Sequence, residues 1–337
     1  MAEINSVSVR RVIVLGTGGT IAGRAASASD NIGYTAGQVG VADLLGGVDA
    51  PEGVGLSAEQ VAQVDSKDMS FAIWRALALR CAHWLAEADV AGIVITHGTD
   101  TLEETAFFLQ SVLAPSKPVV LTCAMRPATA LAPDGPQNVR DAIVVAATQG
   151  ACGVVAVCAG IVHSAFDVQK VHTYRLDAFA SGDAGPLGYV EEGAVRRLRS
   201  WPEAQPGARQ LFDRMTAATA VAWPRVEILV SHAEARGGIV DALLLERELG
   251  AVQPVKGLVL AATGNGTLHH ALQESALRAQ AQGVAVVRAT RCAEGRILPR
   301  ADDALRDAGP LTPVKARIAL MLELLPDSPN SLVPPGA

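Results

Sequence analysis

Short apolar runs of strand length alternate with segments of helix length along most of the chain. In the first half, the predicted strands and helices are, in order, residues 9–16 (strand), 72–87 (helix), 92–96 (strand), 102–113 (helix), 119–124 (strand), 138–148 (helix) and 153–157 (strand). Strands that alternate with helices in this way form mostly parallel sheets covered by helices on both faces. The pattern therefore predicts an α/β fold.

The alternation lapses over residues 191–225, where arginine, proline and glycine punctuate the chain, and then resumes. The second half contains predicted strands at 226–230, 257–261 and 284–288, and predicted helices at 243–249, 268–282 and 313–325. We therefore predict a larger N-terminal domain (1–200) built on a mostly parallel sheet with helices on both faces, a linker (201–225) and a smaller C-terminal α/β domain (226–337). The proline-rich tail 326–337 is predicted to be loosely ordered.

Small polar residues gather where several predicted strands end. The segments in question are 16–20, 96–101, 122–127 and 262–266. In an open parallel sheet, ligands bind outside the carboxyl ends of the strands. The pattern therefore favours one shared cleft over four unrelated turns.

Thr20 lies in a glycine-rich turn directly after the first strand, in the run Leu-Gly-Thr-Gly-Gly-Thr-Ile-Ala-Gly. A hydroxyl in such a turn can act as a nucleophile, because neighbouring backbone N–H groups can hold an oxyanion. A dinucleotide-binding fingerprint fails here, since Ile21 stands where the third glycine or alanine would be, and the turn has no phosphate-binding G-K-[ST]. A plain strand-to-helix turn is the structural alternative.

Thr99 and Asp100 precede the helix predicted at 102–113, so one reading is that this segment caps the helix. A hydroxyl beside a carboxylate also suits catalysis, in which Thr99 works with a base and Asp100 holds a substrate ammonium. Lys170 is the best-placed base, because it follows the apolar region at 153–162. A buried lysine shifts towards its neutral form and can then accept a proton. A solvated surface lysine is the alternative.

Composition narrows the function classes. The net charge is −6, aromatic residues make up only 4% of the chain, and no basic stripe is present, which argues against nucleic-acid binding. The longest apolar runs are about half a membrane span, so we expect no membrane insertion. The five cysteines form no C-x-x-C pair and are interpreted as free thiols in a reducing, cytoplasmic compartment. The histidines lack metal-ligand spacing, so we expect no metal.

The glycine turn and the Thr99 segment together resemble a known family. Residues 15–23 and the run Ile-Thr-His-Gly-Thr-Asp-Thr-Leu-Glu-Glu-Thr-Ala at 95–106 are similar to the two signature blocks of the bacterial L-asparaginase/glutaminase family, and the Glu-Glu-Thr continuation is similar to its type II branch. Further stretches that agree are Met125-Arg126-Pro127, 134–138, 185–189 and 264–266. The resemblance spans roughly residues 11–325.

The resemblance implies a homotetramer of two-domain subunits, without a cofactor and with active sites at the intimate dimer interface. It places the nucleophile at Thr20, with Tyr34 as the lid tyrosine that helps to activate it, and it makes Thr99, Asp100 and Lys170 the second catalytic group. The implied substrate contacts are Ser66 on the α-carboxylate, Thr99 and Asp100, the backbone of Gly19 and Thr99 on the oxyanion, and Asn265 donated to the neighbouring subunit's site.

Two positions depart from the family pattern. Lys67 stands where type II members usually carry a glutamine or glutamate that touches the substrate amino group, and a lysine ammonium there would repel it. We expect Lys67 to turn to solvent or to pair with an acidic neighbour. The acidic residue that the family's C-terminal domain brings to the interface falls within 291–307, a segment too different for the sequence to place it.

The sequence thus predicts an amidohydrolase that converts L-asparagine to L-aspartate and ammonia through a threonine acyl-enzyme. The segment 24–33 is rich in small residues and is predicted to be a mobile lid. A glutaminase-asparaginase of broader specificity is one alternative. A non-catalytic amino-acid-binding protein that uses the same cleft is the other, and it would bind amino acids without releasing ammonia.

Overall fold

The computed structural model describes residues 10–218 and 223–327, and the rest of this section concerns those ranges. The chain forms two compact units that divide between Arg209 and Gln210. This division lies inside the predicted linker 201–225, although the segment also contains the helix α5 (Ala208–Ala217). The predicted loosely ordered tail lies outside the described residues from position 328 onward.

The first unit is built on an eight-stranded sheet with the order β10-β9-β6-β5-β4-β3-β1-β2. Its strands are β1 (Arg10–Gly18), β2 (Val54–Val64), β3 (Val90–Thr96), β4 (Val119–Thr122), β5 (Val154–Cys158), β6 (Ile161–Ser164), β9 (Gly188–Glu191) and β10 (Ala194–Arg197). The five strands from β2 to β5 pair in parallel, while β6, β9 and β10 pair antiparallel. A small separate ribbon joins β7 (Gln169–Lys170) to β8 (Phe179–Ala180).

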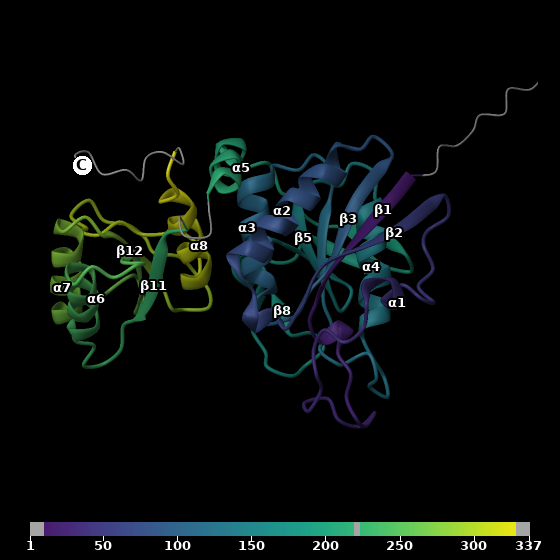
Figure 1. Cartoon of the computed structure of the whole chain (residues 1–337), viewed down its shortest axis with the longest axis horizontal. Helices are drawn as coiled ribbons and strands as arrows, with labels where there is room; N and C mark the ends of the chain where they lie inside the picture. The colour runs from purple at the N-terminus through teal and green to yellow at the C-terminus, as the bar shows by residue number, and fades with distance from the viewer. Residues whose placement is uncertain (1–9, 219–222, 328–337) are drawn as a thin grey trace, which may run out of the picture. The chain divides into compact units, whose positions relative to one another are not determined.

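Helices cover both faces of this sheet. Helices α2 (Phe71–Ala86) and α3 (Leu102–Leu113) lie on one face, and α1 (Val41–Leu44) and α4 (Gly135–Ala147) on the other (Figure 1). The central strand β3 is buried at every position, as expected for a parallel strand between two helical layers. This fold is the mostly parallel α/β sheet that the sequence predicts.

The strands that the sequence analysis missed lie at the two ends of the sheet. The edge strand β2 is only half-buried along most of its length and mixes polar with apolar positions, so no continuous apolar run marks it. Strands β6, β9 and β10 are four residues each, too short to show a period. The short 3-10 helices η1 (Thr20–Ala22), η2 (Ser66–Asp68) and η3 (Gly182–Ala184) were also missed, and η2 follows β2 directly.

The second unit is a smaller parallel sheet with the order β11-β12-β13, formed by Arg225–Val230, Val255–Ala262 and Ala285–Thr290. Helices α6 (Gly238–Glu248) and α7 (His270–Ala281) pack together on one face, and α8 (Pro313–Glu323) covers the other (Figure 1). The helix predicted at 243–249 is thus one half of a longer helix, whose first turns begin after Gly237. No helix in either described range is both long and apolar enough to span a membrane.

Candidate active site

The carboxyl ends of four parallel strands stand level with one another in the first unit. The register pairs Gly16 with Thr96, Thr96 with Thr122 and Thr122 with Val157. Hydrogen bonds cross this edge from Thr17 Oγ1 to the Thr96 carbonyl (2.9 Å) and from Thr122 Oγ1 to the Val157 carbonyl (2.8 Å). The polar residues that follow these strands are therefore gathered on one edge of the sheet.

Thr20 opens the 3-10 helix η1, immediately after the glycine turn that ends β1. Its side chain is buried, and its Oγ1 lies 2.6 Å from the phenol oxygen of Tyr34, with either oxygen able to donate. The chain leaves this site at Arg24 and returns at Thr35, where the two backbones pair antiparallel. The predicted lid (residues 24–33) is thus a closed loop, and Tyr34 follows its last residue.

Lys170 joins Thr99 and Asp100 into a second cluster. Its Nζ donates to Thr99 Oγ1 at 2.7 Å and to Asp100 Oδ1 at 2.6 Å, while Thr99 Oγ1 lies 3.4 Å from the same carboxylate oxygen. The lysine side chain is mostly buried, at 19% exposure, whereas Asp100 is 54% exposed. Lys170 is brought here by the β7–β8 ribbon, where its backbone N–H also binds Glu103 of α3 (3.2 Å).

Two glycines bring the Thr20 and Thr99 turns together. Gly19 has a φ of +81°, and a Cβ on it would overlap the backbone of Gly98. A Cβ on Gly98 would meet Ser66 Oγ at 2.5 Å. Only glycine at both positions allows the turns to approach this closely.

Ser66 ties η2 to the Thr99 segment. Its Oγ accepts the Asp100 N–H (3.1 Å), and its carbonyl accepts the Thr101 hydroxyl (2.8 Å). Because the Ser66 oxygen serves as an acceptor here, its own proton is left to donate to a ligand oxygen. Strand β2 places this residue, so the strand that the sequence analysis missed is the one that completes the site.

The Gly19 N–H donates to the Val64 carbonyl at 2.9 Å. The resemblance assigns this backbone to the oxyanion. In this geometry, the Gly19 N–H can bind an oxyanion only if it weakens or gives up its hydrogen bond to the Val64 carbonyl. A single amide proton rarely supports two good acceptors.

A buried chain of hydrogen bonds supports the Thr99 turn from behind. Trp74 Nε1 donates to Thr105 Oγ1 (2.8 Å), Thr105 Oγ1 lies 2.9 Å from His97 Nε2, and His97 Nδ1 lies 2.7 Å from the Gly98 carbonyl. Since the Gly98 carbonyl can only accept, Nδ1 carries the ring proton, and Nε2 of the neutral ring accepts the Thr105 hydroxyl proton. Complete burial lowers the pKa of His97 to about 4, so the ring is neutral at pH 7. The sequence analysis assigned no role to this histidine.

Lys67 is exposed and paired with acidic neighbours. Its Nζ pairs with Asp65 Oδ2 (2.5 Å) and Asp68 Oδ2 (3.4 Å), and its side chain is 62% exposed. The hydrogen bond to Asp65 raises the pKa of the lysine. The expectation that it pairs with acidic neighbours is confirmed.

The Thr99 cluster opens onto a cavity of about 420 Å³ lined by Asp100, Lys170, Val171, His172 and Thr173. Just beyond it, exposed apolar side chains follow one another along the chain: Val171 (50% exposed), Tyr174 (59%) and Leu176 (37%). The cluster therefore lies next to an exposed apolar surface.

Asn265 belongs to the second unit, in the turn after β12, and is exposed. Its Nδ2 donates to the Leu298 carbonyl (3.2 Å), and its Oδ1 accepts the Leu298 N–H (2.7 Å). Asp302 and Asp303 line the same cavity as Asn265, of about 450 Å³, and both fall in the segment 291–307 where the sequence could not place an acidic residue. Asp303 is committed to Arg288 (2.8 Å), whereas Asp302 pairs with a highly exposed Arg300.

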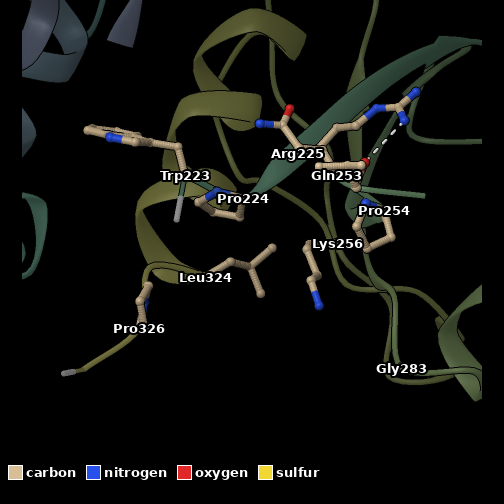
Figure 2. A pocket seen from close by; sticks show the side chains of 10 residues that line it. Trp223, Pro224, Arg225, Gln253, Pro254, Lys256, Gly283, Leu324 and Pro326 are labelled. Atoms are coloured by element: carbon tan, nitrogen blue, oxygen red, sulfur yellow. Dashed lines mark hydrogen bonds between the residues drawn. The ribbon is translucent and has the colours of Figure 1, made fainter. Parts of the chain in front are cut away.

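A further cavity in the second unit, of about 420 Å³, brings together none of the predicted site residues (Figure 2). Proline, tryptophan and leucine side chains form much of its lining, along with Arg225 and Lys256. The guanidinium of Arg225 is neutralised by Glu227 and Glu246, each at 2.7 Å. Its lining lacks the paired hydroxyl and carboxylate groups seen at Thr99, so we assign it no chemistry.

Comparison with known proteins identifies the chain. Residues 11–203 match the family described as asparaginase, N-terminal, and residues 225–329 match the glutaminase/asparaginase C-terminal domain. The chain belongs to the asparaginase/glutaminase family. Like the family, it is an amidohydrolase.

Relatives within the family agree over most of the chain. L-asparaginase 2 of Bacillus subtilis (strain 168) is 37% identical, covering 92% of this chain and 81% of the relative. L-asparaginase 2 of Escherichia coli (strain K12) is 36% identical, with 95% and 90% covered. A glutaminase-asparaginase of Pseudomonas fluorescens biotype A is 35% identical, with 93% and 86% covered. The crystal structure of a probable cytoplasmic L-asparaginase from Campylobacter jejuni superimposes with a TM-score of 0.83 at 34% identity, with 95% and 97% covered.

Proposed function

We propose that this protein hydrolyses the side-chain amide of L-asparagine, giving L-aspartate and ammonia through an acyl-enzyme on Thr20. The observation that carries the proposal is that two hydroxyls at the same edge of the sheet each form a hydrogen bond with a side chain that can give or take a proton. Thr20 lies against Tyr34, and Thr99 lies against Lys170 and Asp100. Two relatives named L-asparaginase 2 support asparagine as the substrate.

In the first half of the reaction, Thr20 Oγ1 attacks the amide carbon while its proton passes to the Tyr34 phenol, which gives its own proton to the leaving nitrogen. Tyr34 ends unchanged, and ammonia departs from an ester on Thr20. The Thr99 backbone N–H holds the oxyanion, which is the part of the transition state that gains charge, and the Gly19 N–H joins it on turning from the Val64 carbonyl.

In the second half, water attacks the ester with Thr99 and Lys170 as the group that accepts its proton. A proton returns to Thr20 Oγ1, and aspartate leaves. Splitting one difficult hydrolysis into two displacements lowers the barrier of each step. Asp100 holds the substrate ammonium, and the Ser66 hydroxyl donates to its α-carboxylate. This assignment uses the free proton that the Asp100 N–H leaves on Ser66.

We also propose that the working enzyme is a homotetramer in which Asn265 reaches the site of a neighbouring subunit at the intimate dimer interface. Three exposed apolar side chains within six residues after Lys170 support a partner surface at this point, since exposed apolar groups that gather on a surface mark association sites. Asp302, the less committed carboxylate beside Asn265, is our candidate for the acidic interface residue. We place the protein in the cytoplasm, where its free thiols are stable.

Ammonia release tests the proposal directly. We expect the wild type to release ammonia from L-asparagine, and Thr20→Ala to fold normally and lose at least about a thousandfold in kcat. Thr17→Ala is a matched control, because Thr17 is a buried threonine near the end of β1, three residues before Thr20, but its hydroxyl donates to a backbone carbonyl. Binding of L-asparagine without ammonia release by the wild type would favour the non-catalytic alternative.

A glutaminase-asparaginase is the second candidate, favoured by the 35% identical Pseudomonas relative of that name. Parallel assays with L-asparagine and L-glutamine separate the two. Equal kcat/KM for both amides would support the broader specificity, and a preference of a hundredfold or more for asparagine would exclude it.

A further inference from the structure

The lid rests on a neighbouring loop of the same unit. The Ala128 N–H donates to the Gly23 carbonyl (3.0 Å) at the start of the lid, and the Leu131 N–H donates to the Ala28 carbonyl (2.9 Å) near its tip. We call residues 127–131 the shelf. Between these backbone contacts, the Thr129 hydroxyl accepts the Ala25 N–H at 2.9 Å.

The shelf is itself firmly held. Both oxygens of Asp134 accept backbone N–H groups, from Met125 and from Arg126, each at 2.9 Å. The Arg126 guanidinium donates to the Ala132 carbonyl (2.9 Å) and so closes the loop on itself. A loop whose two flanking segments are joined in this way can serve as a stationary support.

A short series of contacts connects Ala25 to Tyr34, the residue proposed to activate Thr20. Arg24, its chain neighbour, pairs with Thr35 in both directions, at 3.0 and 2.9 Å. Tyr34 precedes Thr35, and its ring packs on Gly23, where a Cβ would lie 2.8 Å from Tyr34 Cδ2. The position of the phenol on Thr20 therefore depends on where the base of the lid is held.

We propose that Thr129 is a positioning residue that latches the base of the lid to the shelf and so keeps Tyr34 against Thr20. Its hydroxyl is the side-chain acceptor in this set of contacts, whereas the flanking ones are made by the backbone. The link to Tyr34 rests on the proposed function, but the latch can be measured without turnover.

Trypsin provides that measurement. Its cleavage after Arg24 breaks the bond whose nitrogen is the Ala25 N–H, so this N–H must leave Thr129 before cleavage. Arg24 is exposed, and the chain has no other lysine or arginine between it and Lys67. When opening is fast relative to cleavage, the rate at this bond follows the population of the open lid.

We expect Thr129→Val, which keeps the shape but loses the acceptor, to be cut after Arg24 about fivefold faster than the wild type, the factor that corresponds to about 1 kcal/mol. Thr129→Ser retains the hydroxyl and should remain within twofold of the wild type. Ser29→Ala, which removes a hydroxyl that bonds Ser27 Oγ within the lid tip, is the matched control and should also remain within twofold. Cleavage after Arg175, in an exposed loop, should be the same in all four proteins.

With L-asparagine, Thr129→Val should raise KM by a similar factor and leave kcat within twofold, because the substrate must close a lid that is open more often. Cleavage of Thr129→Val at the wild-type rate overturns the latch, as does equal acceleration by Ser29→Ala. Acceleration at Arg175 to the same extent also overturns it, since that would indicate general loosening. An inactive wild type with a fivefold effect at Arg24 would instead contradict only the proposed function.

Discussion

Lys170 is the residue on which the second cluster depends. It is the donor to both Thr99 and Asp100, and it is mostly buried although it lies on a two-residue strand. A lysine held this way orders two other functional groups at once. Replacing it should therefore affect catalysis far more than folding.

We expect Lys170→Met to lower kcat by about a hundredfold to ten-thousandfold, the usual range for loss of a general acid or base. Ammonia release at saturating L-asparagine measures kcat, and thermal unfolding checks the fold. Lys117→Met, which removes a surface lysine bonded to the Glu87 carbonyl, is the control and should leave kcat unchanged. A Lys170→Met enzyme with lower thermal stability but wild-type kcat would make this lysine structural only.

Lys67 differs from Lys170 in that its side chain is exposed and its charge is paired with carboxylates at the surface. Because Asp65 and Asp68 hold its ammonium in solvent, Lys67→Gln should change KM for L-asparagine by less than about tenfold, or 1.4 kcal/mol. Steady-state kinetics at pH 7 measure this. An improvement of a hundredfold or more would show that the ammonium faces the substrate amine, and the substrate assignment would then need revision.

His97 makes stability depend on pH. Its pKa is about 4 in the folded protein and close to the ordinary histidine value of 6.5 in the unfolded chain, so between these values the unfolded chain binds a proton that the folded protein does not. Stability is therefore complete above pH 6.5 and is lost as the pH falls towards 4. From pH 7 to pH 5 this group alone should cost about 2 kcal/mol.

Urea midpoints at pH 7 and pH 5 measure that loss. His97→Asn should show a smaller shift between the two pH values than the wild type, whatever its absolute stability. His83→Gln, a change at an exposed histidine of α2, should show the wild-type shift. Equal shifts in the wild type and His97→Asn would mean that other groups carry the acid sensitivity.

At the scale of elements, the site exists because turns after separate strands approach closely. The Gly19 turn after β1 touches Gly98 after β3, and Gly98 touches Ser66 after β2. Each strand brings one group, and their parallel register brings the groups to the same level. The close approach of these turns is therefore as necessary for the geometry of the site as its side chains are.

We expect Gly19→Ala to lower both thermal stability and kcat, because its Cβ would overlap Gly98 and push the Thr20 and Thr99 turns apart. Gly47→Ala separates this effect from backbone strain, since Gly47 has a similar φ of +88° but no atom within 4 Å of its Cβ position. That control should lose about 1 kcal/mol of stability with unchanged kcat. Similar kcat values for the two variants would show that the close approach is not needed for catalysis.

At the scale of the whole molecule, we expect catalytic activity to depend on the proposed assembly of subunits. Asn265 belongs to the second compact unit and Thr20 to the first, and the resemblance has Asn265 act on a neighbouring subunit. Sedimentation across a dilution series, with ammonia release measured at each concentration, should show activity falling as the oligomer dissociates. A fully active monomer would contradict the proposal that sites are shared between subunits.

Much of this protein follows from its sequence. The run of apolar residues in β1, β3, β4 and β5 marks fully buried parallel strands, because such strands cannot alternate with polar positions. The Thr-Gly-Gly-Thr and Thr-His-Gly-Thr-Asp segments at the strand ends mark the proposed site residues Thr20, Thr99 and Asp100, since ligands bind outside the carboxyl ends of parallel strands. The family was recognisable from these two segments alone.

Other features were decided only by tertiary structure. Strand β2 is an edge strand without an apolar run, so its pairing with β1 depends on the whole sheet, and the position of Ser66 depends on that pairing. The role of His97 arises from burial against Trp74 and Thr105, and the latch at Thr129 from two loops about a hundred residues apart in sequence. Local sequence predicts the buried strands and the longer helices, but distances between side chains on different elements are set by packing, which no local pattern encodes.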